Sequence, residues 1–300
     1  MKFIFKIFLI VLFFLSKQIF AQHESGYSQY MFNGLIINPA YCGSSGVLDA
    51  TISYKNQWTG FGVAPKTLVL GLNSPLKNES SNVGILLLND QFAITNKNRV
   101  LGSYAYRIKL NDKINLRFGI QAGFESIRNN YNQLTIIESG DASFSASKQT
   151  STSFITGTGV YIHSEKWFSG ISLPVLYSTV INGNTMYKPL LIYGGIKNKI
   201  NDDFSIQPSL LIKYIKNSPP QLDINVLLLY QNKYGAGLSY RTSKTIVGNL
   251  FYQINQQFYV GYAVDINTGK LSGLASTSHE IILKYQFGYL KNLQNPKTFY

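Results

Sequence analysis

The sequence predicts an all-β fold, a transmembrane antiparallel β-barrel of about 14 strands preceded by a signal peptide. Three observations support this fold class: an export signal at the start, alternating apolar and polar residues along most of the chain, and connections that alternate between long and short. The predicted organisation is a signal peptide (1–21), an N-terminal periplasmic or lumenal segment (22–46), the outer-membrane barrel (47–288) and a C-terminal periplasmic tail (289–300).

The first 21 residues have the features of a Sec signal peptide. Lys2 and Lys6 make a basic start, residues 8–15 form an apolar core, and the small residue Ala21 stands where a signal peptidase cuts. The apolar core is shorter than the ~18 residues of a transmembrane helix, and no later stretch approaches that length. The chain is therefore expected to be exported to the cell outer membrane of a Gram-negative bacterium, without a membrane-spanning helix.

The composition indicates a surface that meets lipid. Charged residues make up 14% of the chain, against about 25% in soluble proteins, and there are 21 tyrosines and 19 phenylalanines. Of the 27 Lys and Arg residues, three lie in the signal peptide, so the exported chain has 24 basic and 14 acidic residues. The lysines are scattered singly, which argues against nucleic acid as a partner and favours the anionic headgroups of outer-membrane lipids.

Cys42 is the only cysteine, which rules out a disulfide within the chain. A lipoprotein cysteine directly follows the apolar core of its signal, whereas Cys42 follows Leu15 by 27 residues. Cys42 is therefore expected to be a small residue packed in a tight segment.

From Val47 onward the dominant pattern has a period of two residues. In "INLRFGIQAGFE", residues 114–125, every second residue is apolar and its neighbours are polar or small. One face of such a strand suits lipid and the other suits a lumen. Fourteen stretches of this kind are predicted, at about 47–55, 66–74, 82–92, 98–110, 113–127, 153–163, 167–177, 188–199, 203–216, 221–231, 234–242, 245–255, 258–267 and 278–288.

The lengths of the connections support the barrel independently. Those after odd strands include the long stretch 129–152, whereas those after even strands include the two residues "ND" at 111–112. Outer-membrane barrels have long external loops and short periplasmic turns, so a periplasmic N-terminus is expected. Three connections are exceptions. "KNSPP" and "TSKT" follow odd-numbered strands but are short, and "SPLKNESS" follows an even-numbered strand but is longer. A secreted β-sandwich is the alternative, but its outer faces carry more charge than these strands do.

Catalytic chemistry is mostly absent from the sequence. The three histidines, His23, His163 and His279, are far apart, and no Ser, His and acid arrangement suggests a hydrolase. No His, Cys or carboxylate pair has the spacing of metal ligands, and no cofactor is expected. The "GTG" at 157–159 opens no helix, so these are expected to be small residues facing a crowded lumen and not a phosphate loop.

Some charged residues fall on the predicted inner face of the barrel. They either line a pore or form a hydrogen-bonded network that braces the lumen, and bracing is favoured because no ring of one sign repeats. These residues are Arg117, Glu125, Asp223, Asp265, Glu280 and Lys284.

Two segments, "QYMFNGLIINPAYCG" at 29–43 and "KNQWTGFGVAPKT" at 55–67, together resemble the PorP/SprF family of type IX secretion and gliding-motility outer-membrane proteins of the Bacteroidetes. The residues that match the family pattern are Tyr30, Met31, Asn33, Asn38, Pro39, Ala40, Tyr41, Gly43, Gln57, Trp58, Gly60, Ala64, Pro65 and Thr67. The chain departs from that pattern at Cys42 (Ala), Lys55 (Arg) and Val63 (Gly).

The resemblance implies a non-enzymatic barrel that serves type IX secretion. Its implied partners are the periplasmic ring components of that system and a secreted, adhesin-like client protein at the cell surface. Two roles stay open within the family: a core component that contacts the ring, or a dedicated partner that secretes and anchors a large adhesin. A passive porin and an outer-membrane enzyme are the alternatives outside it.

The two motifs also lead to a structural hypothesis. Asn38 before Pro39 biases the chain toward an extended or turned conformation, so a helical plug is not expected. Tyr30, Asn38, Pro39 and Tyr41 are predicted to pack as an ordered segment at the periplasmic mouth. Gln57, Trp58 and Pro65 are predicted to seal the barrel from the other side, which makes the protein a docking platform instead of a pore. The alternative is that both motifs only fix the first hairpin.

Overall fold

The computed structural model describes residues 28–60, 62–131, 148–179, 187–269 and 277–287. The predicted signal peptide with Ala21, and the predicted tail 289–300, lie outside the described residues. Within these residues, no helix has the length and apolar character that a membrane-crossing helix requires.

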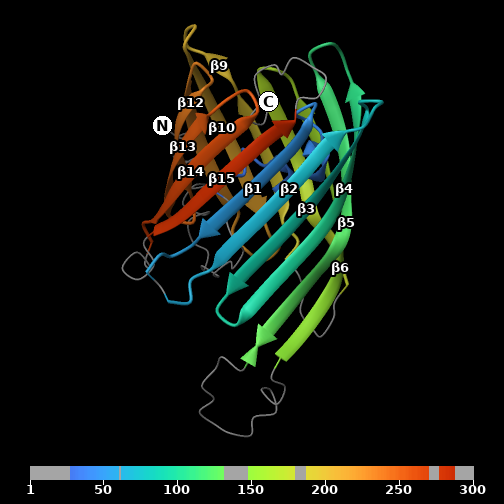
Figure 1. The fold of residues 1–300 in the computed structure, drawn as a ribbon, viewed down its shortest axis with the longest axis vertical. Coiled ribbons are helices and arrows are strands. Elements are labelled where there is room, and N and C mark those ends of the chain that lie inside the picture. Colours follow the sequence, from blue (N-terminus) through green and yellow to red (C-terminus); the bar gives the residue numbers. More distant parts are fainter. Residues whose placement is uncertain (1–27, 61, 132–147, 180–186, 270–276, 288–300) are drawn as a thin grey trace, which may run out of the picture.

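The described strands form one closed antiparallel sheet (Figure 1). Their bounds are β1 Leu48–Asn56, β2 Lys66–Pro75, β3 Ser81–Phe92, β4 Thr95–Lys109, β5 Asn115–Asn130, β6 Lys148–His163, β7 Trp167–Ser178, β8 Leu190–Ile196, β9 Asn198–Lys199, β10 Phe204–Tyr214, β11 Gln221–Tyr230, β12 Tyr234–Arg241, β13 Thr245–Gln253, β14 Phe258–Asn267 and β15 Thr277–Phe287. Except for β8 and β9, each strand pairs with the next, and β1 pairs with β15 to close the barrel. Because β8 and β9 both pair with β10, they occupy one position in the wall. The predicted barrel of about 14 strands is therefore confirmed.

Most predicted strand bounds agree with the structure within a few residues, and the largest difference is at β6. This strand begins at Lys148 and not at 153, because its ladder with β5 continues to the pair formed by Asn130 and Lys148. β4 likewise begins at Thr95 and not at 98. The added residues are mostly polar on both faces, so they break the alternation from which the strand ends were predicted.

The two faces of the wall differ as the alternation predicts. On β5, Phe118 and Ile120 point outward and are 47% and 62% exposed, whereas Arg117 and Gln121 point into the lumen and are buried. An apolar outer face around a polar interior is the arrangement of a membrane barrel and the reverse of a soluble protein. The β-sandwich alternative is excluded.

The outward face should tolerate charge poorly. Leu238, in the middle of β12, is 67% exposed. Leu238→Arg is expected to destabilise the barrel in liposomes by about 2–4 kcal/mol, because an outward arginine at mid-membrane must be held in hydrocarbon. Urea unfolding followed by tryptophan fluorescence measures the change, and Lys233→Arg in the β11–β12 turn is the control. An unchanged midpoint for Leu238→Arg would place this face in water.

The two ends of the barrel differ in the lengths of the connections between their strands. The turn end carries short connections, among them 110–114, 164–166 and 231–233. The loop end carries the longest ones, at 57–65, 131–147 and 179–189, but also two short ones, at 93–94 and 242–244. The predicted alternation of lengths therefore holds only in part, because the β3–β4 and β12–β13 hairpins are tight.

Candidate functional site

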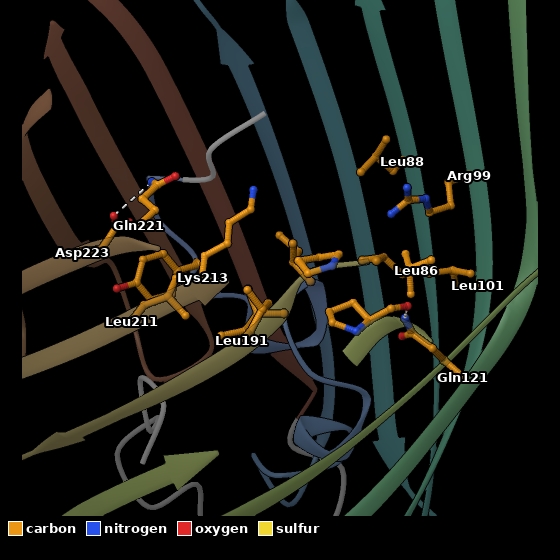
Figure 2. A pocket seen from close by; sticks show the side chains of 16 residues that line it. Leu86, Leu88, Arg99, Leu101, Gln121, Leu191, Leu211, Lys213, Gln221 and Asp223 are labelled. Carbon is orange, nitrogen blue, oxygen red and sulfur yellow. Dashed lines mark hydrogen bonds between the residues drawn. The ribbon is translucent and has the colours of Figure 1, made fainter. Parts of the chain in front are cut away.

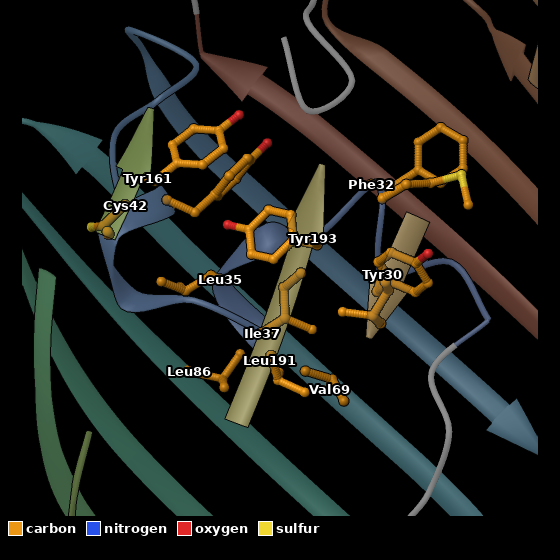
Figure 3. Close-up of a cluster of buried hydrophobic side chains, with 14 of the residues drawn as sticks. Tyr30, Phe32, Leu35, Ile37, Cys42, Val69, Leu86, Tyr161, Leu191 and Tyr193 are labelled. Atoms are coloured by element: carbon orange, nitrogen blue, oxygen red, sulfur yellow. The ribbon is translucent and has the colours of Figure 1, made fainter. Parts of the chain in front are cut away.

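The lumen holds the chain that precedes β1. Residues 28–46, the lumenal segment, enter beside the loop end and leave at the turn end, where β1 begins. Residues 28–43 are buried except for the partly buried Ile36. Figure 3 shows Leu35 and Ile37 of the segment among Val69, Leu86 and Leu191 of the wall.

The start of the segment is fixed by charged residues near the loop end of β1, β14 and β15. The backbone nitrogen of Ser28 donates to the carboxylate of Glu280 (2.8 Å), and its hydroxyl donates to Asp265 (2.5 Å). Lys55 donates both to the Ser28 hydroxyl and to Asp265, each at 2.7 Å. All four residues are buried, so these charge-assisted hydrogen bonds are strong ones. We call this group the loop-end latch.

The middle of the segment packs against the side of the barrel formed by β11 to β15. The ring of Phe32 stacks on Phe251 of β13 with centroids 5.1 Å apart. The ammonium of Lys284 on β15 donates to the Phe32 carbonyl (3.3 Å) and binds Asp49 on β1 (2.9 Å). Two strands from β13, Asn225 of β11 donates to the sulfur of Met31 (3.3 Å).

Asn38 organises the second half of the segment. Its side-chain oxygen accepts a hydrogen bond from the Ala40 backbone (2.8 Å) and so caps the short 3₁₀ helix Pro39–Tyr41, where proline suits the first position. Its amide nitrogen donates to the Val160 carbonyl on β6 (2.9 Å) and to the Tyr193 hydroxyl on β8 (3.0 Å). One asparagine therefore shapes the turn and fastens it to the wall.

Glycines in the wall make room for this turn. Gly119 of β5 and Gly159 of β6 face each other across the ladder. A Cβ at Gly119 would overlap the backbone of Pro39 and Ala40, and one at Gly159 would overlap the Asn38 side chain. The prediction that the "GTG" residues face a crowded lumen is confirmed for Gly159.

The last part of the segment is held by Arg117, which is 2% exposed. Its two terminal nitrogens donate to the carbonyls of Cys42 (3.0 Å) and Gly43 (3.2 Å). Gly43 has a φ of +69°, and its nitrogen donates to Asn73 (2.8 Å). Cys42 is fully buried, as the sequence predicts.

The inward charges form a bracing network, as predicted. Arg99 binds Glu125 at 2.6 Å, and Arg241 binds Asp223 at 2.9 Å and Asp265 at 3.3 Å. The sequence predicted Glu125, Asp223, Asp265, Glu280 and Lys284 of this network, but not Asp49, Lys55, Arg99 or Arg241. Lys55, where the family pattern has arginine, keeps a carboxylate contact through Asp265.

The placement of the first motif differs from the prediction. Of the four residues predicted at the periplasmic mouth, Tyr30 does not lie at the turn end, because the segment runs along the lumen, whereas Asn38 and the turn Pro39–Tyr41 lie nearer to it. The segment fills the lumen with turns, including a second short 3₁₀ helix at Gly34–Ile36, and contains no α-helix. A signal for this burial was available in the sequence: no charged residue stands between Glu24 and Asp49.

The second motif lies at the loop-end rim, in the β1–β2 connection. The Gln57 nitrogen donates to the Pro65 carbonyl (2.9 Å), and the Trp58 nitrogen donates to Ser278 on β15 (3.1 Å). The Trp58 ring meets Phe92 of β3 edge-on, with centroids 6.3 Å apart. Pro65 is buried, Ala64 is partly buried, and Gly60 is exposed with a φ of +97°. The sealing role of these residues stays a prediction.

The histidines stand apart from one another. His163 stacks on Tyr161 inside the barrel, His279 stacks on Tyr262, and His23 lies outside the described residues. In the part of the chain that the structure describes, no three His, Cys, Asp or Glu side chains are grouped so that they could hold a metal ion.

Comparisons with known proteins agree with this architecture. The model of the family described as "Type IX secretion system membrane protein PorP/SprF" matches residues 19–285. The chain is similar to the CymD monoaromatic hydrocarbon channel with a TM-score of 0.54 and 13% identity, covering 86% of this chain and 93% of that one. It is also similar to Omp33 of Acinetobacter baumannii (TM-score 0.48, 10% identity, 80% and 98% covered) and to the toluene transporter TodX of Pseudomonas putida (0.48, 10%, 89% and 98%). No curated protein sequence matches the chain significantly.

Proposed function

Because the chain belongs to the PorP/SprF family of type IX secretion system membrane proteins, we propose that it is a non-enzymatic outer-membrane component of this system that acts as a docking platform and not as a pore. The observation that carries this proposal is the lumenal segment. It occupies the lumen from the loop-end latch to Arg117 and is bonded to the wall at both ends. A filled barrel offers its two ends as binding surfaces instead of a path for solutes.

The two ends suit different partners. At the turn end the segment emerges at residues 44–46, which are partly buried or exposed and lie just before β1. Periplasmic ring components of the secretion system are the proposed partners there. The loop end, with the longest connections and the second motif, is the proposed contact for a secreted adhesin-like client that the barrel helps to export and anchor.

A passive porin is the alternative, and the name of CymD as a channel makes it worth testing. Purified protein in liposomes is expected to give no swelling above empty liposomes with small sugars, because the lumenal segment lies across the path. A known general porin in the same liposomes is the positive control. Swelling that matches this porin would support the passive channel and contradict the docking platform.

Deletion of the gene tests the proposed secretion function in cells. Surface adhesin, detected by antibody on whole cells, is expected to disappear and to return with a plasmid copy. Loss of one adhesin alone would indicate a dedicated partner, and loss of all type IX cargo would indicate a core component. Normal export of every cargo in the deletion strain would contradict the proposed function.

A further inference from the structure

The outer wall of the barrel carries a groove, whereas the filled lumen has little room left. Inside the barrel, the space beside Ile36 of the lumenal segment measures about 90 Å³ (Figure 2), well below the roughly 300 Å³ of a small ligand site. Outside, two adjoining hollows of about 460 and 580 Å³ lie on the face formed by β10 to β14. They share Leu228, Ala236, Leu250 and Tyr262 and so make one depression, which we call the wall groove.

Two small outward residues form the floor of the wall groove. Ala236 of β12 pairs with Leu250 of β13, and Leu238 of β12 pairs with Gly248 of β13. Leu250 and Leu238 are 60% and 67% exposed, because each stands beside a neighbour with little or no side chain. A Cβ at Gly248 would have no heavy atom within 4 Å apart from its chain neighbours, so the floor is open there. The groove therefore runs along β12 and β13 between apolar side chains.

Aromatic rings and a lysine mark the turn end of the groove. The rings of Tyr234 and Tyr252 stack with centroids 5.1 Å apart, and Tyr230 continues the row at 6.3 Å from Tyr234. The ammonium of Lys233 lies 5.6 Å from the centroid of Tyr234 and 5.9 Å from that of Tyr252. Tyrosines and a lysine at the ends of strands suit the level of the lipid headgroups.

The turn between β11 and β12 holds Lys233 in place and leaves its charge available. The nitrogen of Lys233 donates to the Tyr230 carbonyl (2.9 Å), across a two-residue turn in which Gln231 and Asn232 have φ values of +50° and +53°. The lysine is exposed, and no carboxylate of the described residues lies within ion-pair distance of its ammonium. The carboxylate of Asp203, in the adjacent turn, accepts a hydrogen bond from the Gln231 amide (2.9 Å). The contacts with the tyrosine rings orient the ammonium but do not neutralise it.

We propose that the wall groove binds one phospholipid with an anionic headgroup, taken from the leaflet at the turn end. An acyl chain of the lipid lies along Ala236 and Gly248, and its phosphate faces Lys233. A ligand that fits this surface is apolar along its length and anionic at one end, which is the chemistry of such a lipid. The site is separate from the proposed docking role, since it does not involve the lumenal segment.

Two lipids with the same acyl chains test the charged end of the site: dioleoyl phosphatidylglycerol, which is anionic, and dioleoyl phosphatidylethanolamine, which has no net charge. Each is titrated into the purified barrel in detergent, and native mass spectrometry measures the dissociation constant of the first bound lipid. The anionic lipid is expected to bind about fivefold more tightly, since one lysine near a headgroup contributes that much. Lys233→Gln is expected to remove this preference, whereas Lys113→Gln, an exposed lysine in the β4–β5 turn, keeps it.

A second pair of variants tests the apolar part. Gly248→Phe fills the groove and is expected to abolish saturable binding of both lipids, whereas Gly102→Phe, on the outward face of β4, keeps it. Equal affinity of the wild type for the two lipids, or saturable binding that persists in Gly248→Phe, would overturn the proposal. Dimers in the same spectra that Gly248→Phe removes would overturn it as well, by assigning the groove to a second copy of the chain. If Gly248→Phe does not fold, judged by migration on gels with and without boiling, the comparison of Lys233→Gln with Lys113→Gln decides.

Discussion

Replacing Gly119 with valine is expected to open the barrel to ions. Even the first carbon of a side chain at this position would overlap the backbone of Pro39 and Ala40, so the turn capped by Asn38 must leave its place. Valine itself suits a strand, which leaves the wall intact. Since a wall of this size is wider than the eight-stranded barrels that side chains fill, we expect the conductance per molecule in planar bilayers to rise about tenfold or more.

The matched control is Gly102→Val. Gly102 lies on the neighbouring strand β4, is exposed on the outward face, and has only a backbone oxygen at 3.9 Å from an added Cβ. This variant should conduct like the wild type. A Gly119→Val barrel that folds and stays closed would show that the turn is not what blocks the lumen.

The second large effect is expected at Arg117. Arg117→Met removes both donors from the buried carbonyls of Cys42 and Gly43. Each such bond to a charged group contributes about 1.5–3 kcal/mol, so the detached state of this part of the segment should become at least about a hundredfold more populated. Cys42 is the only cysteine and fully buried, so its rate of reaction with a water-soluble maleimide reports this detachment directly and should rise by a similar factor.

Arg107→Met is the control for this experiment, because Arg107 is the cross-strand neighbour of Arg117 on β4. Its ion pair is with Glu79 at 3.3 Å, and because the Glu79 carboxylate is 43% exposed to solvent, which screens the pair, it is expected to contribute about 0–1 kcal/mol although Arg107 is only 15% exposed. Its labelling rate should stay close to that of the wild type. Equal labelling of the two variants would mean that Asn38 and its partners hold the segment without Arg117.

The wall of the barrel could be predicted because lipid acts on every strand in the same way. Outward residues must be apolar, whereas many inward ones are polar or small, so a local period of two residues carries the information. The strand ends could not be predicted where this alternation stops. The hairpin of β5 and β6, for example, continues into polar residues such as Asn130 and Gln149. Their pairing depends on the partner strand and not on the side of the wall they face.

The place of the lumenal segment could not be predicted in the same way. Its decisive contacts join residues that are far apart in the sequence, as in the bond of Ser28 to Glu280, and they exist only once the barrel is closed. A motif that precedes β1 was therefore placed near the end where β1 starts. Six inward charges were predicted from the alternation along single strands, but pairs such as Arg241 with Asp265 require knowing which strands are neighbours.

The position of the loop-end latch also couples the lumenal segment to closure of the barrel. Lys55 and Glu280, which are partners in the β1–β15 register, are the same residues that hold Ser28. The bonds of Ser28 to both residues can therefore be complete only when the two seam strands lie side by side.

Closing the cylinder and fastening its interior are thus one late event, and it joins parts of the chain separated by 252 residues. Contacts of such long range are slow to form. A nascent chain delayed before this event would carry an open edge on β1 and another on β15. The machinery that inserts the barrel would have to cover these two edges until they meet.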